Sequence, residues 1–470
     1  MFPRLFTLFF GAFLGLTLLK FGNPPIMEKW VTPPGNTFEF LLGSPWPITW
    51  GYSLLGLLAI AGFFAAEKNV KAPSWILALP LAWLLWEALA AALTLDPALS
   101  RPTVAHFVAC VSCFYLGFLC FPDIRRVTWL LPGLLCGVLI VLAVGWQQHF
   151  GGLEETRRYF FLYIYPSLKE VPPEYLKKIS STRIFSTLFY PNALAGAVLL
   201  FLPALLEFVW QARQRFTLSA RVFLVATIGI AALACLYWSG SKGGWLLMLI
   251  LGMIWLLRLP FDSRVKQAVI ALVLVAGLAG FFWRYSGFFH KGATSVGARF
   301  DYWHAAVRTT ISHPFFGTGP GTFSIAYQRV KRPEAEMSRL VHNDYLEQAS
   351  DSGLPALLLY AGLIISVLTC TAPPFGRFGR QTGLGLRNSR QVADSNPGAA
   401  TGSGNDGPGI SSESSLSFAL WLGVLGWALQ GLMEFGLYIP ALAWPAFTFM
   451  GLLLRRRFSL RRLPGMGTPL

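Results

Sequence analysis

Long apolar stretches recur along nearly the whole chain, and they restrict its possible folds more than any other feature. Each is about 17 to 25 residues long, enough to cross a hydrocarbon core of roughly 30 Å as a helix. Hydrophobic residues make up 54% of the 470 residues and charged residues only 13%, which is more apolar surface than a water-soluble core can hide. The sequence therefore predicts an all-α polytopic membrane protein with no separate soluble enzyme domain.

A hydropathy window identifies about twelve of these segments. The first resembles the apolar region of a signal peptide, but no A-x-A cleavage site follows it, so we expect a membrane helix there. The abundant Trp and Phe suit such a protein, because Trp settles at the lipid headgroups and Phe fills apolar surface between helices. The expected spans are 4–20, 48–66, 74–94, 102–121, 127–149, 191–210, 222–238, 243–257, 267–283, 353–370, 416–437 and 440–454.

The basic residues predict the orientation of the chain. The net charge of +16 comes without a run of Lys and Arg interleaved with aromatic residues, so we expect no nucleic-acid partner. With the N-terminus in the cytoplasm, every short basic connection falls on the cytoplasmic side, as the known insertion bias requires. Those connections carry Lys68, Lys71, Arg125, Arg126, Arg213, Arg215, Arg221, Arg258, Arg264, Lys266, Arg455, Arg456, Arg457, Arg461 and Arg462. Both termini are then cytoplasmic.

Three connections fall on the outer side in this topology: 21–47, 150–190 and 284–352. The last predicts two short helices. The first should stop before Pro314 and has one apolar stripe, formed by Phe300, Trp303, Val307 and Ile311. The second is expected over 338–352, closed by Gly353, with one face formed by His342, Leu346 and Ala349.

Residues 371–415 differ from the rest of the chain, because Gly, Ser, Asn, Pro and Arg dominate and bulky apolar residues are nearly absent. This composition predicts a disordered cytoplasmic linker. The expected organisation is N-terminal spans over 1–180, a core over 181–370, the linker, and C-terminal spans with a basic tail over 416–470.

Basic residues from three separate segments are placed on the outer face, and they are candidates for binding an anion. Arg183 stands before a span, Lys242 lies in the turn SGSKGG between two spans, and Arg299 lies at the start of the first loop helix. A diphosphate bound at the low-dielectric edge of a helical bundle requires fixed cations of this kind. His342 is the candidate for proton chemistry, with three other histidines in the same stretch as competitors: His290, His304 and His313.

Charged groups inside the spans are few, which argues against a proton-coupled transporter with a chain of ionisable residues near the midplane. Glu207 is close enough to a helix end to reach the interface, whereas Glu87, His106 and Glu434 are left without an assigned role.

No metal or other cofactor is expected. The C-x-x-C formed by Cys110 and Cys113 has no second pair and no flanking His, as a zinc site would need. The acidic pair Glu334 and Glu336 could bind a divalent cation, but it lies in a charged stretch without other ligands. The sequence GTGPG at 317–321 has no strand before it and is interpreted as a turn rather than a phosphate loop.

Four motifs occur in the order found in one known family: RIFSTLFYPNALAG (183–196), SGSKGGWL (239–246), ARFDYWHAAVRTTISHPFFGTGPGTF (298–323) and VHNDYLEQASDSGLPAL (341–357). The chain resembles the O-antigen ligase and O-antigen polymerase superfamily over roughly residues 180–370. Two departures concern the family's Ser-Arg-Gly, here Ser241-Lys242-Gly243, and its Asn-Pro-Asn, here Tyr190-Pro191-Asn192. Lysine keeps the charge of arginine but loses its bidentate phosphate geometry.

The resemblance implies a metal-independent membrane glycosyltransferase of the C type, in a bacterial inner membrane, that acts on the periplasmic face. Its donor would be a glycan on undecaprenyl diphosphate, and its acceptor a glycolipid, a glycan or a protein. By position, Arg183, Lys242 and Arg299 correspond to residues that bind the diphosphate, and His342 to the catalytic histidine. From the same motifs we expect Asn192, Asn343 and Tyr345 to support the site.

Three acceptors stay open at this stage: the lipid A core for a ligase, the growing glycan for a polymerase, and a protein hydroxyl for an oligosaccharyltransferase. A lipid-linked glycan flippase is the alternative of another class, and it predicts cations along a path through the membrane instead of a cluster at one face. A scaffold in a polysaccharide-assembly complex is the third hypothesis, and it predicts no effect from substituting these residues.

The predicted topology can be tested with reporter fusions. Alkaline phosphatase, which is active only outside the cytoplasm, should be active when fused after residue 320 and inactive when fused after residue 385. A green fluorescent protein fused at the same two positions should give the opposite pattern. Phosphatase activity at residue 385 would reverse the orientation and remove the predicted outer location of His342.

Overall fold

The computed structural model describes residues 2–37, 39–43, 45–67, 72–167, 180–259, 262–290, 294–333, 335–373 and 409–460. Across these ranges the regular structure is entirely helical. The long helices are α1 (Phe2–Lys20), α2 (Ile48–Ala65), α3 (Ser74–Ala92), α4 (Pro97–Cys120), α5 (Ile124–Gln147), α8 (Pro191–Gln211), α9 (Leu218–Trp238), α10 (Lys242–Arg258), α11 (Ser263–His290), α14 (Asp344–Cys370), α16 (Gly409–Gln430) and α17 (Pro440–Leu460). The prediction of an all-helical fold is confirmed for these residues.

Nine helices in the described ranges are long and apolar enough to cross a membrane. They lie in α1 to α5, α8, α9, α11 and α14, and α16 adds a shorter apolar helix over Ser414–Gln430. Each of the twelve expected spans overlaps one of the long helices, including α10, which has only 17 residues, and α17, whose last turns contain three consecutive arginines. The protein is therefore a multi-pass membrane protein with nine to ten candidate spans.

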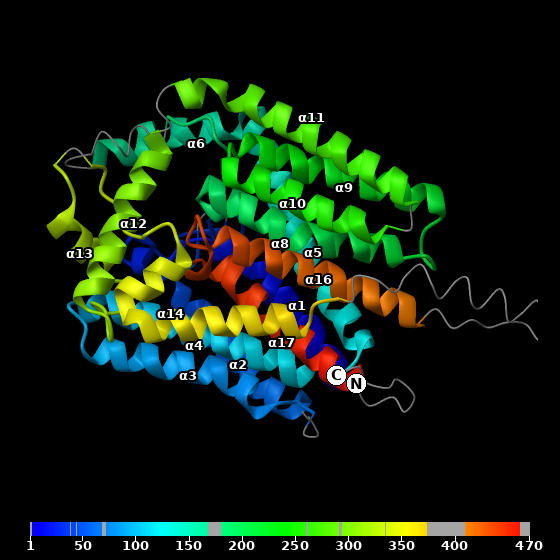
Figure 1. Ribbon diagram of the computed structural model, residues 1–470, viewed down its shortest axis with the longest axis horizontal. Coiled ribbons are helices and arrows are strands. Elements are labelled where there is room, and N and C mark those ends of the chain that lie inside the picture. The colour runs from blue at the N-terminus through cyan, green and yellow to red at the C-terminus, as the bar shows by residue number, and fades with distance from the viewer. Residues whose placement is uncertain are drawn as a thin grey trace, which may run out of the picture.

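The helices form a bundle (Figure 1), and they differ in how many of their residues are buried. Within the most apolar window of each helix, 78% of residues are buried in α8 but only 6% in α11. Helices α9, α10 and α11 form a layer along one side of the bundle, and α2 and α3 flank the other side. The start of α1 and the end of α17 lie at one end of the bundle, and α12 (Thr294–Ser312) and α13 (Phe323–Val330) lie at the opposite end.

Helices α1 and α5 approach each other through two glycine pairs, Gly11 with Gly15 and Gly133 with Gly137. A Cβ at Gly15 would lie 2.3 Å from the carbonyl oxygen of Gly133, and one at Gly137 would lie 2.5 Å from the carbonyl oxygen of Gly15. In lipid there is no hydrophobic force between helices, so small residues at fourfold spacing let backbones pack closely. These glycines join the first helix of the chain to the fifth.

The connections at the α12 end contain the shorter helices. They are η1 (Pro25–Trp30), η2 (Glu39–Gly43), η3 (Gln148–Gly152), α6 (Leu153–Tyr159), η4 (Phe160–Ile164), η5 (Tyr165–Ser167), η6 (Ser186–Leu188), α12, α13 and η7 (Gly436–Tyr438). The predicted helix before Pro314 is α12. Its apolar stripe is turned outward, with Phe300 61% and Ile311 75% exposed, whereas Tyr302 and Ala306 form its buried face.

Three predicted boundaries are wrong. The second loop helix begins at Asp344 instead of residue 338, because the Asn343 side chain caps it there, although Gly353 breaks the helix as expected. The span expected over 416–437 ends at Gln430, which leaves Glu434 outside the helix. The predicted linker lies mostly outside the described residues, but its end, 409–415, belongs to α16.

The glycine contact between α1 and α5 can be tested by overpacking. Gly15→Leu should destabilise the protein by about 2 kcal/mol or more, because the side chain has to displace the α5 backbone. Gly56→Leu is the control, since no atom lies within 4 Å of a Cβ at Gly56, and its effect should stay within about 0.5 kcal/mol. Thermal unfolding of the purified variants in detergent measures both, and equal melting temperatures would contradict the contact.

Candidate functional site

Arg183 lies in a segment whose backbone is hydrogen-bonded to a side chain of η3. The Gln148 side chain accepts hydrogen bonds from the backbone amides of Phe185 and Ser186, at 3.0 and 2.7 Å, and donates to the Ser186 carbonyl at 3.1 Å. Ser186 and Phe189 both adopt positive φ angles, 56° and 60°, which L-residues rarely adopt. The backbone that carries Arg183 is therefore both strained and firmly bonded to its surroundings.

The turn SGSKGG places Lys242 next to the same segment. Gly240 has a φ of +62°, and a Cβ there would lie 3.2 Å from the Arg183 Nε. Arg183 Nε donates to the Ser239 carbonyl at 2.6 Å, and Ser241 caps α10, so that Lys242 is the first residue of that helix. A Cβ at Gly243 would lie 3.2 Å from the Met433 sulfur. Lys242 is thus followed directly by Gly243, which packs against the turn after α16.

That turn, residues 431–439, carries Glu434 and is held by the first turn of α14. The Asp344 amide donates to the Gly431 carbonyl at 2.7 Å, and the Asp344 carboxylate accepts from the Leu437 amide at 3.0 Å. Asn343 also donates to the Leu432 carbonyl at 3.0 Å. A Cβ at Gly431 would lie 2.8 Å from the Asp344 carboxylate, so this approach requires glycine.

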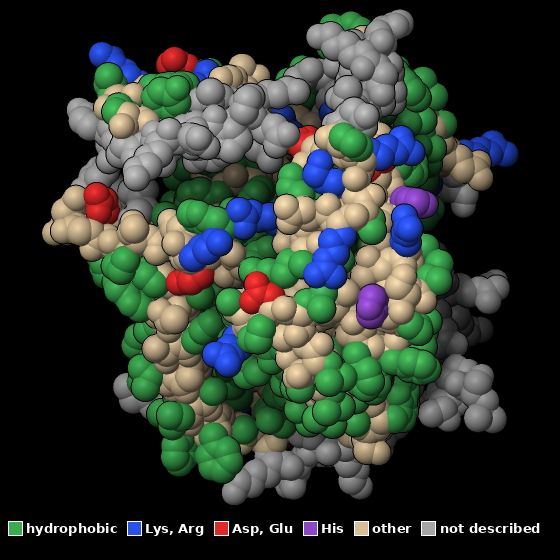
Figure 2. Space-filling model, turned by 90° about the vertical axis from the view of Figure 1, so that its left-hand side faces the viewer, with side chains coloured by type: hydrophobic (Ala, Val, Ile, Leu, Met, Phe, Trp, Pro, Cys, Tyr) green, Lys and Arg blue, Asp and Glu red, His purple; other side chains and the backbone are tan. Residues whose placement is uncertain are grey.

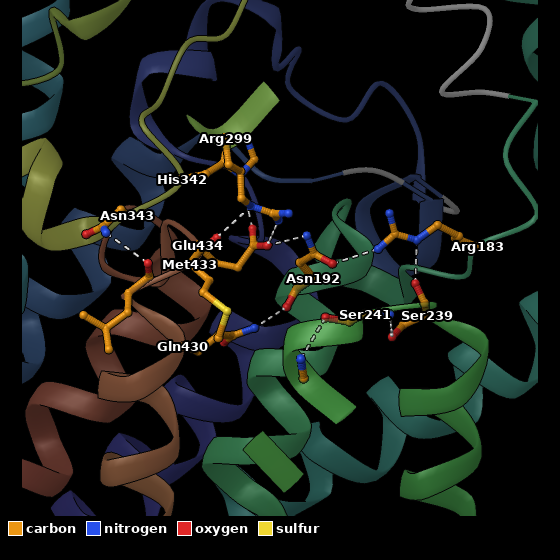
Figure 3. A network of polar contacts seen from close by, with 12 residues as sticks. Arg183, Asn192, Ser239, Ser241, Arg299, His342, Asn343, Gln430, Met433 and Glu434 are labelled. Carbon is orange, nitrogen blue, oxygen red and sulfur yellow. Dashed lines mark hydrogen bonds and ion pairs between the residues drawn. The ribbon is translucent and has the colours of Figure 1, made fainter. Parts of the chain in front are cut away.

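Glu434 connects Arg299, His342 and Asn192 (Figure 3). One carboxylate oxygen accepts from the Arg299 guanidinium and from the Asn192 amide, the latter at 2.6 Å. The other lies 3.2 Å from the His342 Nδ1. Asn192 in turn accepts from Arg183 at 2.7 Å, so a single chain of polar contacts runs from Arg183 to His342.

The electrostatics favour an ionised Glu434, which is only 8% exposed. Burial by itself would raise the pKa of the carboxyl group. The hydrogen bond from His342 and the positive charges of Arg299, His342 and Arg183 outweigh burial, and the pKa lies below its ordinary value of 4.5. At neutral pH the carboxylate can therefore only accept hydrogen bonds.

This state of Glu434 determines which nitrogen of His342 carries a proton. Because the carboxylate faces Nδ1, that nitrogen is the donor, and in a neutral imidazole Nε2 keeps its lone pair. The ring packs edge-on against Phe435 and parallel to Tyr302, with centroids 4.8 and 5.8 Å away. The His342 side chain is 28% exposed, and its backbone has a φ of +56°. The arrangement orients the imidazole and leaves it partly exposed.

The structure places the other predicted residues as follows. Arg299 lies in the second turn of α12 and not at its start, since α12 begins at Thr294. Asn343 caps α14 by accepting from the amides of Tyr345 and Leu346, and the Tyr345 hydroxyl donates to the Ala428 carbonyl at 3.0 Å. Asn192 has the most direct connection, because it joins Arg183 to Glu434.

Two functional candidates were not identified from the sequence. Glu434 was left unassigned, although an acidic residue in a long apolar region was a signal that it has a partner. Gln430, which donates to the Asn192 carbonyl at 2.8 Å, gave no signal at all. Of the competing histidines, His304 and His313 are exposed, and the side chain of His290 lies outside the described residues.

In the described ranges, no group of three or more His, Cys, Asp or Glu side chains could hold a metal ion. Glu334, one half of the acidic pair considered for a cation, lies outside those ranges. The six cysteines are free.

The end face of the molecule that contains α12 is shown in Figure 2. Basic and histidine side chains gather across its middle, near a recess with apolar walls, and acidic side chains are fewer. A face of this kind suits a ligand with a negatively charged head and an apolar tail.

Comparison with known proteins identifies the family of part of the chain. Residues 227–361 match the family model described as O-antigen ligase, which confirms the resemblance. The matched stretch includes Lys242, Arg299 and His342, and it leaves out Arg183, Asn192 and Glu434. An uncharacterized protein of Haemophilus influenzae is 28% identical over 187 residues, which cover 35% of this chain and 45% of that protein. The chain thus carries an O-antigen ligase family domain and matches less than half of this relative's length.

The central role of Glu434 can be tested by Glu434→Gln. The change leaves Arg299 partly buried without its counter-charge and should cost about 3 kcal/mol of stability at pH 7. The contribution of an ionised group with a lowered pKa is complete above the unfolded-state pKa and is lost as the pH falls through the folded-state value. The difference in melting temperature from wild type should therefore shrink below about pH 4.5.

The control is Glu154→Gln. Glu154 pairs with Arg157 at 2.8 Å, but the Glu154 side chain is 75% exposed, so the loss of stability should stay below about 1 kcal/mol. Equal effects of the two substitutions at pH 7 would contradict the organising role of Glu434.

Proposed function

We propose that this protein transfers a glycan from an undecaprenyl-diphosphate carrier to an acceptor hydroxyl on the periplasmic face of a bacterial inner membrane. The observation that carries the proposal is the chain of contacts that brings Arg183, Arg299 and His342 together around Glu434. In sequence, Arg183 and His342 are 159 positions apart, yet the two side chains are joined through only Asn192 and Glu434. The O-antigen ligase domain over residues 227–361 supports the same reaction class.

The reaction would begin at His342. Its Nε2 accepts the proton of the acceptor hydroxyl while that oxygen attacks the anomeric carbon of the donor sugar. The bond between this carbon and the diphosphate oxygen breaks, and the lipid diphosphate leaves with the electron pair. Attack opposite the leaving group inverts the anomeric centre. Glu434 would hold the imidazole in the required tautomer and stabilise the imidazolium that forms.

The cations would act on the leaving group. Negative charge builds on the diphosphate as the bond breaks, so fixed positive groups that bind it more tightly at that stage lower the barrier. We assign this role to Arg183, Lys242 and Arg299. Asn192 and Ser239 hold the Arg183 side chain in place, which limits the reorganisation that would be needed on binding.

The proposal includes a topology of twelve spans with both termini in the cytoplasm. The proposed site lies at the α12 end of the bundle, and the start of α1 and the end of α17 lie at the opposite end (Figure 1). A site on the outer side has no access to ATP, and the energy for the transfer would come from the sugar–diphosphate bond already present in the donor.

A flippase for lipid-linked glycans is the second candidate, and it would need cations distributed along a path through the membrane. The contacts among Arg183, Arg299 and His342 at one end of the bundle favour the transferase. The acceptor can be a lipid A core, a growing glycan or a protein. Loss of a polymerase leaves single repeat units attached to their acceptor, whereas loss of a ligase leaves unattached lipid-linked glycan.

The test is transfer by the purified full-length protein from a defined undecaprenyl-diphosphate-linked glycan, with EDTA present. His342→Ala should reduce the rate by about 100-fold or more, because general-base catalysis contributes at least that much. His313→Ala, at an exposed histidine of the same outer stretch, is the control and should keep the wild-type rate. Equal rates for these two variants would overturn the catalytic role of His342, and inhibition by EDTA would overturn a metal-independent mechanism.

A further inference from the structure

Arg339 lies three residues before His342, and its exposed side chain projects from a firmly held backbone. Its neighbours Ser338, Leu340 and Val341 are only 8%, 4% and 0% exposed. The Ser338 hydroxyl donates to the Leu340 carbonyl at 2.7 Å, and the Val341 amide donates to the Glu347 carboxylate at 3.2 Å. The segment therefore presents the Arg339 side chain in a fixed position without burying it.

The Arg339 guanidinium contacts the outer loop after α1. Its Cζ lies 4.0 Å from the ring centroid of Trp30, the last residue of η1, and the Lys29 ammonium lies 4.4 Å from the same ring. A cation–π contact positions a guanidinium but uses none of its five N–H donors for an acceptor oxygen. Across the part of the chain that the structure describes, no oxygen accepts a hydrogen bond from Arg339.

Tyr190 lies beside the proposed catalytic site and interacts electrostatically with Arg339. Its ring packs edge-on against Phe435 with centroids 5.3 Å apart, and Phe435 packs against His342. Burial raises the pKa of Tyr190 to about 12, and the nearby charge of Arg339 opposes this rise. Within the described ranges the Tyr190 hydroxyl also has no hydrogen-bond partner. The Tyr190 ring is thus separated from His342 by one aromatic ring, and Arg339 lies three residues before His342 in the same segment.

Arg339 differs in this respect from the two arginines of the polar network. Arg183 and Arg299 each donate to oxygens of the protein: Ser239 and Asn192 for the first, and Met433 and Glu434 for the second. Arg339 is positioned by an aromatic ring instead, so its donors are available for an anion from outside. Planar guanidinium donors match the paired oxygens of phosphate and carboxylate groups.

We propose that Arg339 and Tyr190 form an anion-binding subsite beside His342, which takes a phosphate or carboxylate group of a substrate. The subsite rests on the proposed function for its role in transfer, but its binding can be measured without transfer. The anion can belong to the diphosphate of the donor lipid or to a charged group on the acceptor glycan, and the experiment separates these two sources.

The experiment measures equilibrium binding to the full chain in lipid nanodiscs. One probe is undecaprenyl diphosphate, and the others are a phosphorylated oligosaccharide and the same oligosaccharide after phosphatase treatment. The variants are Arg339→Gln, Arg339→Lys, Tyr190→Phe and the control Arg308→Gln. Arg308 is exposed and lies nine residues after Arg299 on α12, about 13 Å along the helix axis.

Arg339→Gln should raise the Kd of one anionic probe about 10-fold or more, as expected for a lost charge-assisted contact. Arg339→Lys should lose less affinity for this probe, because the positive charge remains. Tyr190→Phe should weaken binding of the same probe. Weaker binding of undecaprenyl diphosphate assigns the subsite to the donor. Weaker binding of the phosphorylated oligosaccharide, with its dephosphorylated form unchanged, assigns it to the acceptor.

The subsite would be overturned if Arg339→Gln, like Arg308→Gln, bound all probes with the wild-type Kd. A lower melting temperature of Arg339→Gln would not rescue it, because that result would show only that Arg339 anchors η1. The result is independent of the proposed function. If the wild-type protein transfers no glycan but binds a probe that Arg339→Gln binds more weakly, the function is refuted and the subsite is kept. Loss of transfer in His342→Ala with unchanged binding in Arg339→Gln would keep the function and refute the subsite.

Discussion

The ionised carboxylate of Glu434 is the interaction on which the site depends. A buried negative charge is costly unless it is paired and hydrogen-bonded, and Glu434 finds its partners in three separate parts of the chain. Asn192 comes from the start of α8, Arg299 from α12, and His342 from the residues just before α14. Because the carboxylate needs all of these donors, it fixes the three elements relative to one another before any substrate binds.

The helical bundle supplies the rigidity that this arrangement requires. The turn that carries Glu434 is fastened to α14 through Asp344 and Asn343, and η7 is fastened to α3 by a buried contact chain. In that chain Trp83 donates to Gln348, which donates to the Tyr438 hydroxyl. Side chains placed on short turns between long helices can hold a catalytic geometry, since the helices restrict how far the turns can move.

Backbone strain is concentrated in the same place. The three residues other than glycine with positive φ in the described ranges are Ser186, Phe189 and His342. Two flank the polar network in the segment after Arg183, and the third is the proposed base. Such conformations persist only where the surroundings hold them, here through Gln148 on one side and Glu434 on the other. The strained backbone therefore lies in the two segments that carry Arg183 and His342, where hydrogen bonds hold the residues in place.

Much of the fold was predictable because hydropathy and charge are local properties that add up along the chain. Whether an apolar stretch is long enough to cross the membrane does not depend on its neighbours in the fold. All twelve expected segments accordingly overlap long helices. Helix ends were less predictable. The N-cap at Asn343 depends on one side-chain contact, and it moved His342 from the expected helix into the turn before it.

The sequence alone determined a helical membrane protein with an O-antigen ligase domain, and it identified three basic residues and a histidine as candidates for the site. Only the tertiary structure decided that Glu434 links them, that Arg339 contacts Trp30, and which nitrogen of His342 holds its proton. Asn192 and Glu434 lie 242 positions apart, and no local pattern reports a contact between such distant residues. The partner of a charged group depends on which helices pack together, which is a property of the whole bundle.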